Sequence, residues 1–416
     1  MKKELPLFQN IWVAVCLFNF FIAALMGTML RYGFVSNIPF NFKHLTHGHS
    51  HIAMLGWVYL MLYTFIVHKF IPQKRQVFTY LFWTTQLAVV GMMISFPLQG
   101  YAAISISFSV LHIFCSYYFA RLVWKNQENN TLPEKLLLKS ALVFMLLSTV
   151  GIWCLGPAVA LAGKQSVFYH LAIQFFLHFQ FNGWFLLAVF ALFFKYLNNL
   201  KAVINLKLFN KFYSSLIFAT LFTYALPVSW YVSHPALFWI NALGIFLQLV
   251  SFWFLIKIIL PHFSLIWKNA TTRIIKKTMI FTCASIGLKI LLQTTSLFPE
   301  IASISFQIKH LVIGFIHLTM LGVVSGFLLL FLLQSKWFSE NKFIPWGINI
   351  FFIGFLGTEF LLFIQGGMFY FQFHQISYYH LLLLLFSCFL LLGITLLFIG
   401  FLSNLIKNIP REQPTN

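Results

Sequence analysis

Histidines are the residues in this sequence whose number and spacing could support chemistry. A motif made of a histidine, four residues and a glycine occurs three times, starting at His51, His178 and His317. On an α-helix this offset places the glycine about 140° around the axis and about 7.5 Å along from the histidine. Each motif would therefore combine a ligand on one face with a missing side chain on the flank, where a neighbouring helix or a flat cofactor can come close.

Each motif is preceded by another histidine at nearly helical spacing. The upstream histidines are His44, His170 and His310, which lie seven, eight and seven residues before their partners. A step of seven residues returns to almost the same helix face. The first copy is richer still, because the stretch HGHSH also contains His47 and His49.

Metal coordination explains this set of histidines better than polar bridging between helices. The sequence has 7 acidic residues, none of them Asp, and only Glu359 falls well inside an apolar run. Polar groups in hydrocarbon are costly and need partners. Neutral imidazoles that coordinate iron or copper are therefore the economical interpretation, although one such histidine alone is usually a structural bridge. Arg31 could pair with a haem propionate, or could simply extend toward the membrane surface.

Composition indicates the setting of these histidines. The chain of 416 residues is 60% hydrophobic and 8% charged, whereas soluble domains are about a quarter charged. Because about 20 apolar residues span a bilayer, we predict an all-α polytopic membrane protein with twelve transmembrane helices, embedded in a lipid bilayer. The predicted spans lie near 8–32, 40–66, 77–98, 100–124, 136–162, 166–194, 208–232, 235–259, 273–295, 306–333, 343–365 and 376–404.

The positive charges predict the orientation of these helices. The net charge is +20, but the lysines and arginines sit in short loops and form no basic face, so we expect no nucleic-acid partner. With twelve spans, 22 Lys and Arg fall on one side, 4 on the other, and Lys289 within a span. Cytoplasmic loops carry the excess of positive charge. We therefore expect a bacterial inner-membrane protein with both termini in the cytoplasm.

The three motifs fall on predicted helices 2, 6 and 10, which are four helices apart. This spacing predicts three groups of four helices related by a pseudo-threefold axis, a parallel repeat of a kind found in membrane folds. All three helices would start on the outer side. We expect His51, His178 and His317 to lie at similar depth and to approach a common cofactor.

With these features the chain resembles subunit I of the haem-copper oxidase superfamily, which includes cytochrome oxidases and nitric oxide reductases. The stretch HGHSHIAMLGW is also similar to the second helix of the NnrS family, membrane haem-copper proteins linked to nitric oxide stress. The resemblance implies haem ligands on helices 2 and 10 and a copper ligand on helix 6. The matching positions are His47, His49 or His51; His310 or His317; and His170 or His178. His380, which opens the last predicted helix, is a further metal-ligand candidate.

The sequence departs from the oxidases in the region of their copper site. Residues 208–232 contain no histidine, where the oxidases have an adjacent pair, and the two histidines on predicted helix 10 are seven residues apart. We therefore expect a divergent haem-binding protein, with copper as a second candidate cofactor. It would act in electron transfer or in O2 or NO chemistry, together with other respiratory subunits or an electron donor. The alternative is a transporter or channel for a metal ion or haem, although a path would need polar groups through both leaflets.

Overall fold

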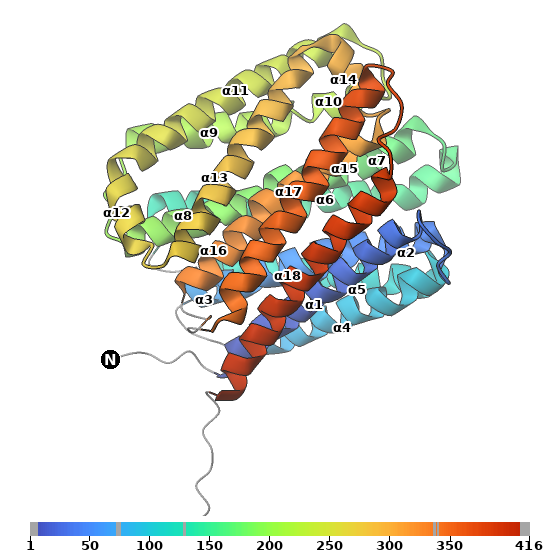
Figure 1. Cartoon of the computed structure of the whole chain (residues 1–416). Helices are drawn as coiled ribbons and strands as arrows, with labels where there is room; N and C mark the ends of the chain where they lie inside the picture. The colour runs from blue at the N-terminus through green and yellow to red at the C-terminus, as the bar shows by residue number, and fades with distance from the viewer. Residues whose placement is uncertain (1–6, 72–75, 128–129, 336–337, 339–340, 408–416) are drawn as a thin grey trace, which may run out of the picture.

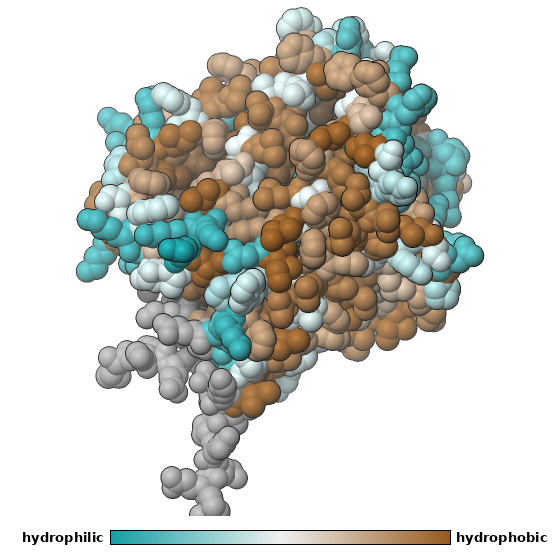
Figure 2. Space-filling model, viewed as in Figure 1, coloured by the Kyte–Doolittle hydropathy of each residue, from teal (hydrophilic) through white to brown (hydrophobic). Residues whose placement is uncertain are grey.

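The predicted all-helical character of the protein is confirmed. The computed structural model describes residues 7–71, 76–127, 130–335, 338 and 341–407, and all secondary-structure elements in these ranges are helical. Eleven of the described helices are long and apolar enough to cross a membrane. In Figure 2, hydrophobic residues cover the middle of the bundle and hydrophilic residues gather toward its ends. The chain is therefore a polytopic membrane protein in contact with lipid.

Long helices joined by short loops make up the structure (Figure 1). In chain order they are α1 (Leu7–Tyr32); α2, η1 and α3 (Phe42–His51, Ile52–Tyr59, Leu60–Phe70); α4 (Gln76–Gln99); α5 (Ala103–Asn126); α6 (Leu132–Ala162); α7, η2 and α8 (Val167–His178, Phe179–Phe185, Leu186–Asn199); α9 and α10 (Leu206–Phe222, Ala225–Ser229); α11, η3 and α12 (Pro235–Ile259, Leu260–His262, Phe263–Asn269); α13, η4 and α14 (Arg273–Thr294, Thr295–Leu297, Pro299–Ser305); α15, η5 and α16 (Lys309–His317, Leu318–Ser325, Gly326–Gln334); α17 (Phe343–Tyr370); and α18 (Tyr379–Lys407).

The eleven candidate spans leave out α13, although it is 22 residues long. This helix corresponds to the ninth predicted span. It is the least apolar of the long helices because it begins with Arg273, carries Lys276 and Lys277 in its first turns and has Lys289 in its second half. Among these basic residues only Lys289 is buried, with 4% of its surface accessible.

Three of the long helices share an unusual backbone. The α-helical hydrogen bonding of each gives way to a π-helical segment, η1, η2 or η5, and then resumes. Figure 1 shows that the preceding segments α2, α7 and α15 lie toward one end of the bundle and α3, α8 and α16 toward the other. The three interrupted helices therefore run in the same direction.

The π-helical segments lie in the hydrophobic core and are linked to one another. The Trp57 indole of η1 donates a hydrogen bond of 2.8 Å to the Ser325 hydroxyl of η5. The Tyr59 ring of η1 lies 6.1 Å from the Trp184 ring of η2, measured between centroids. Segments η2 and η5 also contact each other. The centre of the molecule is therefore formed where the three irregular segments meet.

Side-chain caps fix the starts of two of the interrupted helices. The Asn41 side chain accepts hydrogen bonds from the backbone N–H groups of Lys43 and His44, at the start of α2. The Ser166 hydroxyl accepts one from the N–H of Tyr169, at the start of α7. These bonds satisfy backbone donors that have no partner within the helix. Because the caps fix where α2 and α7 begin, they also fix how far along each helix its histidines lie.

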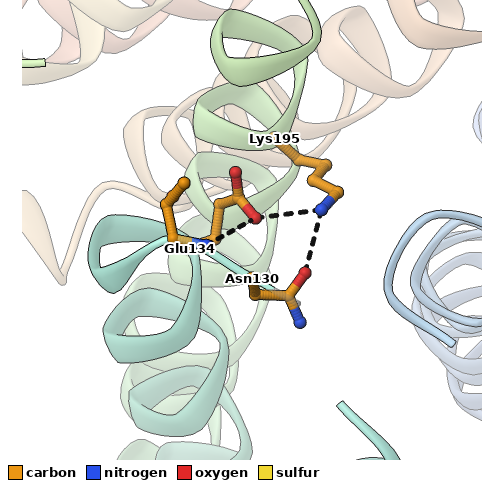
Figure 3. Close-up of polar contacts among 4 residues, drawn as sticks. Asn130, Glu134 and Lys195 are labelled. Carbon is orange, nitrogen blue, oxygen red and sulfur yellow. Dashed lines mark hydrogen bonds and ion pairs between the residues drawn. The ribbon is translucent and has the colours of Figure 1, made fainter. Parts of the chain in front are cut away.

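A buried ion pair ties together helix ends at the side of the bundle opposite α2. Lys195, near the end of α8, lies 3.0 Å from a Glu134 carboxylate oxygen in the first turn of α6, and also donates to Asn130 (Figure 3). The same carboxylate accepts from the N–H of Thr131. The Lys195 ammonium also lies 5.5 Å from the centre of the Phe70 ring, at the end of α3. Glu134 is completely buried, so its charge depends on these partners.

Candidate functional site

Each histidine of the repeated motif occupies the same place relative to a π-helical segment. His51, His178 and His317 are the residues that immediately precede η1, η2 and η5. π-Helical turns are rare and occur frequently at functional sites. The repeat recognised in the sequence therefore corresponds to a repeated backbone feature, which marks one level of the bundle on three helices.

The motif glycines allow neighbouring helices to come close to these segments. A Cβ atom on Gly183 would lie 2.6 Å from the Phe144 Cβ of α6. One on Gly322 would lie 2.8 Å from the Phe355 ring of α17 and 2.9 Å from the Ser285 hydroxyl. At Gly56 the nearest atoms, on Val89 and Asn19, would lie 3.0 and 3.1 Å away. The glycines thus serve helix packing, one of the two uses predicted for them.

The three motif histidines nevertheless have different neighbours. His51 packs on the Phe96 ring at 4.2 Å, His178 faces α9, and His317 faces α17. Within the described ranges, no contact joins any two of the three, and no group of three His, Cys, Asp or Glu side chains is placed to hold a metal ion. Each motif histidine therefore belongs to surroundings of its own.

On α2 the histidines divide between two faces. His47 and His51 are four residues apart, and both contact the Tyr101 ring, at 4.6 and 5.8 Å. His51 Nδ1 is bonded to the His47 carbonyl oxygen at 2.8 Å. His49 is rotated by roughly 200° from either of them and faces α1. If one histidine of α2 is a cofactor ligand, its identity therefore determines which face of the helix meets the cofactor.

His49 is held firmly against α1. Its Nδ1 lies 2.8 Å from the Ala23 carbonyl oxygen, so Nδ1 carries the proton and donates it. Gly27 makes this approach possible, because a Cβ there would lie 2.9 Å from the His49 ring. In the described part of the chain His49 Nε2 has no hydrogen bond. A carbonyl bond at one ring nitrogen with the other left available is the usual arrangement of a metal-ligating histidine.

His317 lies on the other side of the same region. Its Nδ1 is 4.0 Å from a carboxylate oxygen of Glu359 on α17, beyond hydrogen-bonding distance. The side chain keeps 26% of its surface accessible, so the ring is not sealed into the core. Both carboxylate oxygens of Glu359 are buried and lack a hydrogen-bond partner in the described residues. Such buried polar atoms require a partner.

Arg31, at the end of α1, is the cation of this region. It is close enough to interact electrostatically with His317, Glu359 and Tyr379, and His49 is near enough to His317 to do the same. Its guanidinium takes part in none of the ion pairs found among the described residues. These residues, Arg31, His49, His317, Glu359 and Tyr379, are called the Arg31 cluster below.

His310 and His380 lie at the edge of the Arg31 cluster. The His310 ring is 5.4 Å from the Tyr379 ring, and the His380 ring stacks on Phe34 at 4.8 Å. Both are near enough to Arg31 to feel its charge. The cluster therefore draws on α1, α2, α15, α17 and α18. Tyr379 was not singled out in the sequence, although its position beside His380 at the start of an apolar run is a usable signal.

The histidines of α7 have their protein partners outside the Arg31 cluster. His178 Nε2 lies 2.7 Å from the Thr220 carbonyl oxygen, and the ring contacts Tyr224. His170 stacks on Tyr231, with ring centroids 5.1 Å apart. The two histidines have different partners, and in the described structure neither belongs to a group of three His, Cys, Asp or Glu side chains that could hold a metal ion. This arrangement does not fit a copper centre.

A second group of unpaired polar atoms lies between η1 and η2. The Tyr59 hydroxyl, His112 Nε2 and Trp184 Nε1 are buried and lack hydrogen-bond partners in the described residues. The Tyr59 and His112 rings meet edge to face at 4.6 Å. Their polar atoms belong to three different helices, but only one of the three residues is a histidine.

Comparison with known proteins gives no family for this chain. No family model matches it, and no curated protein matches its sequence.

Proposed function

We propose that the protein is a haem-binding membrane protein that transfers electrons, with His49 and His317 as the two axial ligands. The observation that carries this proposal is the state of the two imidazoles. His49 is fixed through Nδ1 with Nε2 free, and His317 makes no hydrogen bond in the described structure and is partly accessible. His49 and His317 lie on the second and tenth predicted spans, which are the ligand helices that the resemblance to oxidase subunit I implies.

The charges of the Arg31 cluster support the same proposal. Haem propionates are anionic, and Arg31 is beside the two histidines and takes part in no ion pair among the described residues. Arginine binds carboxylates through a planar pair of donors. Arg31 would therefore hold a propionate, while Glu359 would accept a hydrogen bond from the N–H group at His317 Nδ1 after a small closing movement from 4.0 Å. Haem would supply a one-electron redox centre whose potential depends on these neighbours.

Two histidine ligands favour electron transfer over gas chemistry. If both imidazoles held the haem iron, a diatomic ligand would have to displace one of them. Copper is not part of the proposal because the residues of α7 do not fit a copper site. The partner would be an electron donor or acceptor reached from the outer end of the bundle, where α1 and α15 bring Arg31 and His310 together.

The purified protein is expected to show a Soret band and the sharp α-band of a six-coordinate haem when reduced. Because the sequence has no CxxCH motif, acid acetone should extract the haem. Carbon monoxide added to the reduced protein should leave the spectrum unchanged, since both axial positions are filled. A folded protein, expressed with ample haem, that has no Soret band would refute the proposal; a large shift with carbon monoxide would support gas binding instead.

The proposal includes the architecture of twelve spans in three groups of four, with α13 as the ninth span. The direction shared by the three interrupted helices supports it, as does the return of α18 to the end of the bundle where α1 begins (Figure 1). The bias of 22 Lys and Arg to 4 supports an orientation with that end, and both termini, on the cytoplasmic side of a bacterial inner membrane.

Reporter fusions test this orientation. Fusions in the connections after α3, α5, α8, α12 and α16 should all report a cytoplasmic location, because these connections are on the positive side. Fusions between α1 and α2 and between α6 and α7 should report the outside. If α13 does not span the membrane, fusions before and after it will report the same side, which would reduce the count to eleven.

A further inference from the structure

A small cavity lies among α8, α9, α11 and α13, away from the Arg31 cluster. Its volume is about 50 Å³, and its wall includes Thr220, Gln248, Lys289 and Gln293 among mostly apolar side chains. About 10–15 Å³ of such space is enough for one water molecule, so this cavity can hold one small ion or a few waters. No Asp or Glu lines it.

Lys289 brings a positive charge to this cavity without a compensating negative one. Its side chain is buried, and it takes part in no ion pair among the described residues. Its ammonium donates one hydrogen bond, of 3.1 Å, to Gln293 Oε1, and lies 5.5 Å from the centre of the Phe315 ring. An ammonium has three donors, and a charge buried in a protein within a membrane is costly unless it is paired.

The two glutamines on the wall are arranged to leave donors available. Gln293 Oε1 accepts from both Lys289 and Gln248 Nε2, the latter at 3.1 Å. No hydrogen bond from the Gln293 Nε2 group is found among the described residues, so this amide remains able to donate. The Thr220 and Thr223 hydroxyls, by contrast, donate to carbonyls of their own helix. The donors that remain available on the wall therefore include the Lys289 ammonium and the Gln293 amide.

We propose that this cavity binds one small monovalent inorganic anion, held by the Lys289 ammonium and the Gln293 amide. A positive charge together with amide donors favours an anion over a cation, and the low dielectric constant of the bundle strengthens the attraction. This volume suits an anion of the size of chloride, bromide or nitrate better than the much larger gluconate. The site is independent of the haem proposal, because it uses other helices and other residues.

Thermal unfolding of the full-length protein in detergent tests the site without reference to haem. In gluconate buffer, adding chloride, bromide or nitrate should raise the unfolding midpoint of the wild-type protein saturably, by about 3 °C or more at saturation, because a ligand of the folded state stabilises it. Lys289→Met should remove this dependence. Lys277→Met is the matched control, since Lys277 lies on the same helix, is exposed and donates a hydrogen bond to Asn349, outside the wall of the cavity.

A second variant keeps the test decisive if Lys289→Met does not fold. Ala219→Leu would fill the cavity from α9 while leaving Lys289 in place, and should also abolish the anion dependence. Bromide soaked into crystals should give an anomalous peak beside the Lys289 ammonium. The proposal is overturned if chloride, nitrate and gluconate give the wild-type protein the same midpoint, or if the anion effect survives in both cavity variants.

Discussion

Replacing either His49 or His317 with Ala is expected to reduce bound haem by about tenfold or more, because removal of an axial ligand should lower the affinity for haem at least as much as removal of a residue that only supports a ligand, which typically costs about 10- to 100-fold. The absorbance of the Soret band per protein, with iron content measured on the same sample, reports the loss. His51→Ala and His178→Ala should retain most of the haem, since these rings face Phe96 and the Thr220 carbonyl instead of the Arg31 cluster.

The matched control for these variants is His262→Ala. His262 lies at the start of α12, where its Nε2 is 3.2 Å from the Val203 carbonyl oxygen, on the predicted cytoplasmic side. The His262→Ala variant loses an imidazole ring that lies outside the Arg31 cluster, so its absorption spectrum should match that of the wild-type protein. The opposite pattern, with haem lost in His51→Ala and kept in His49→Ala, would show that the other face of α2 carries the ligand.

Breaking the buried ion pair between Glu134 and Lys195 is expected to lower the free energy of unfolding by about 3 to 5 kcal/mol. Lys195→Met leaves the Glu134 carboxylate, which is completely buried, without its cation. Glu134→Gln should cost less, because the amide keeps the hydrogen bond from Lys195 and Lys195 is 15% accessible. Denaturant titration in mixed micelles, followed by tryptophan fluorescence, measures the change.

The double variant Glu134→Leu/Lys195→Met tests why Lys195→Met loses stability. The cause is either the lost attraction between the two charges or the buried carboxylate left without a cation. If the penalty comes from the uncompensated carboxylate, removing both charges should restore much of the stability lost in Lys195→Met. Additive losses in the double variant would mean that the two side chains act separately. Lys201→Met, two residues beyond α8 and exposed, is the control for removal of a positive charge.

Apolar runs and glycine or polar breaks predicted the helical, membrane-embedded character of the chain, because hydrocarbon tolerates little besides helices. They were least informative for α13, where buried Lys289 and the basic first turns lower the hydropathy of a helix that the structure contains. The hydropathy of the α13 sequence does not reveal that Lys289 lines a cavity between helices. That fact depends on side chains contributed by α8, α9 and α11.

The candidate site was predicted only in part. The motif identified the helices of His51, His178 and His317, but it drew attention to His51, whereas the contacts favour His49. The difference arises because the HGHSH stretch alternates between two helix faces, and sequence alone does not reveal which face meets α1. Gly27 provides that information only after α1 and α2 are packed together, when it makes room for the His49 ring.

The π-helical segments also affect how this protein tolerates changes in length. A π-turn holds one residue more than an α-turn. Deleting a residue from an ordinary transmembrane helix rotates everything beyond it by about 100°, which would turn lipid-facing side chains inward. In η1, η2 and η5 the extra residue can instead be removed if the π-turn becomes an α-turn. The side chains of the flanking segments then keep their orientation around the helix axis. Relatives of this chain are therefore best sought with alignments that permit one-residue gaps directly after His51, His178 and His317.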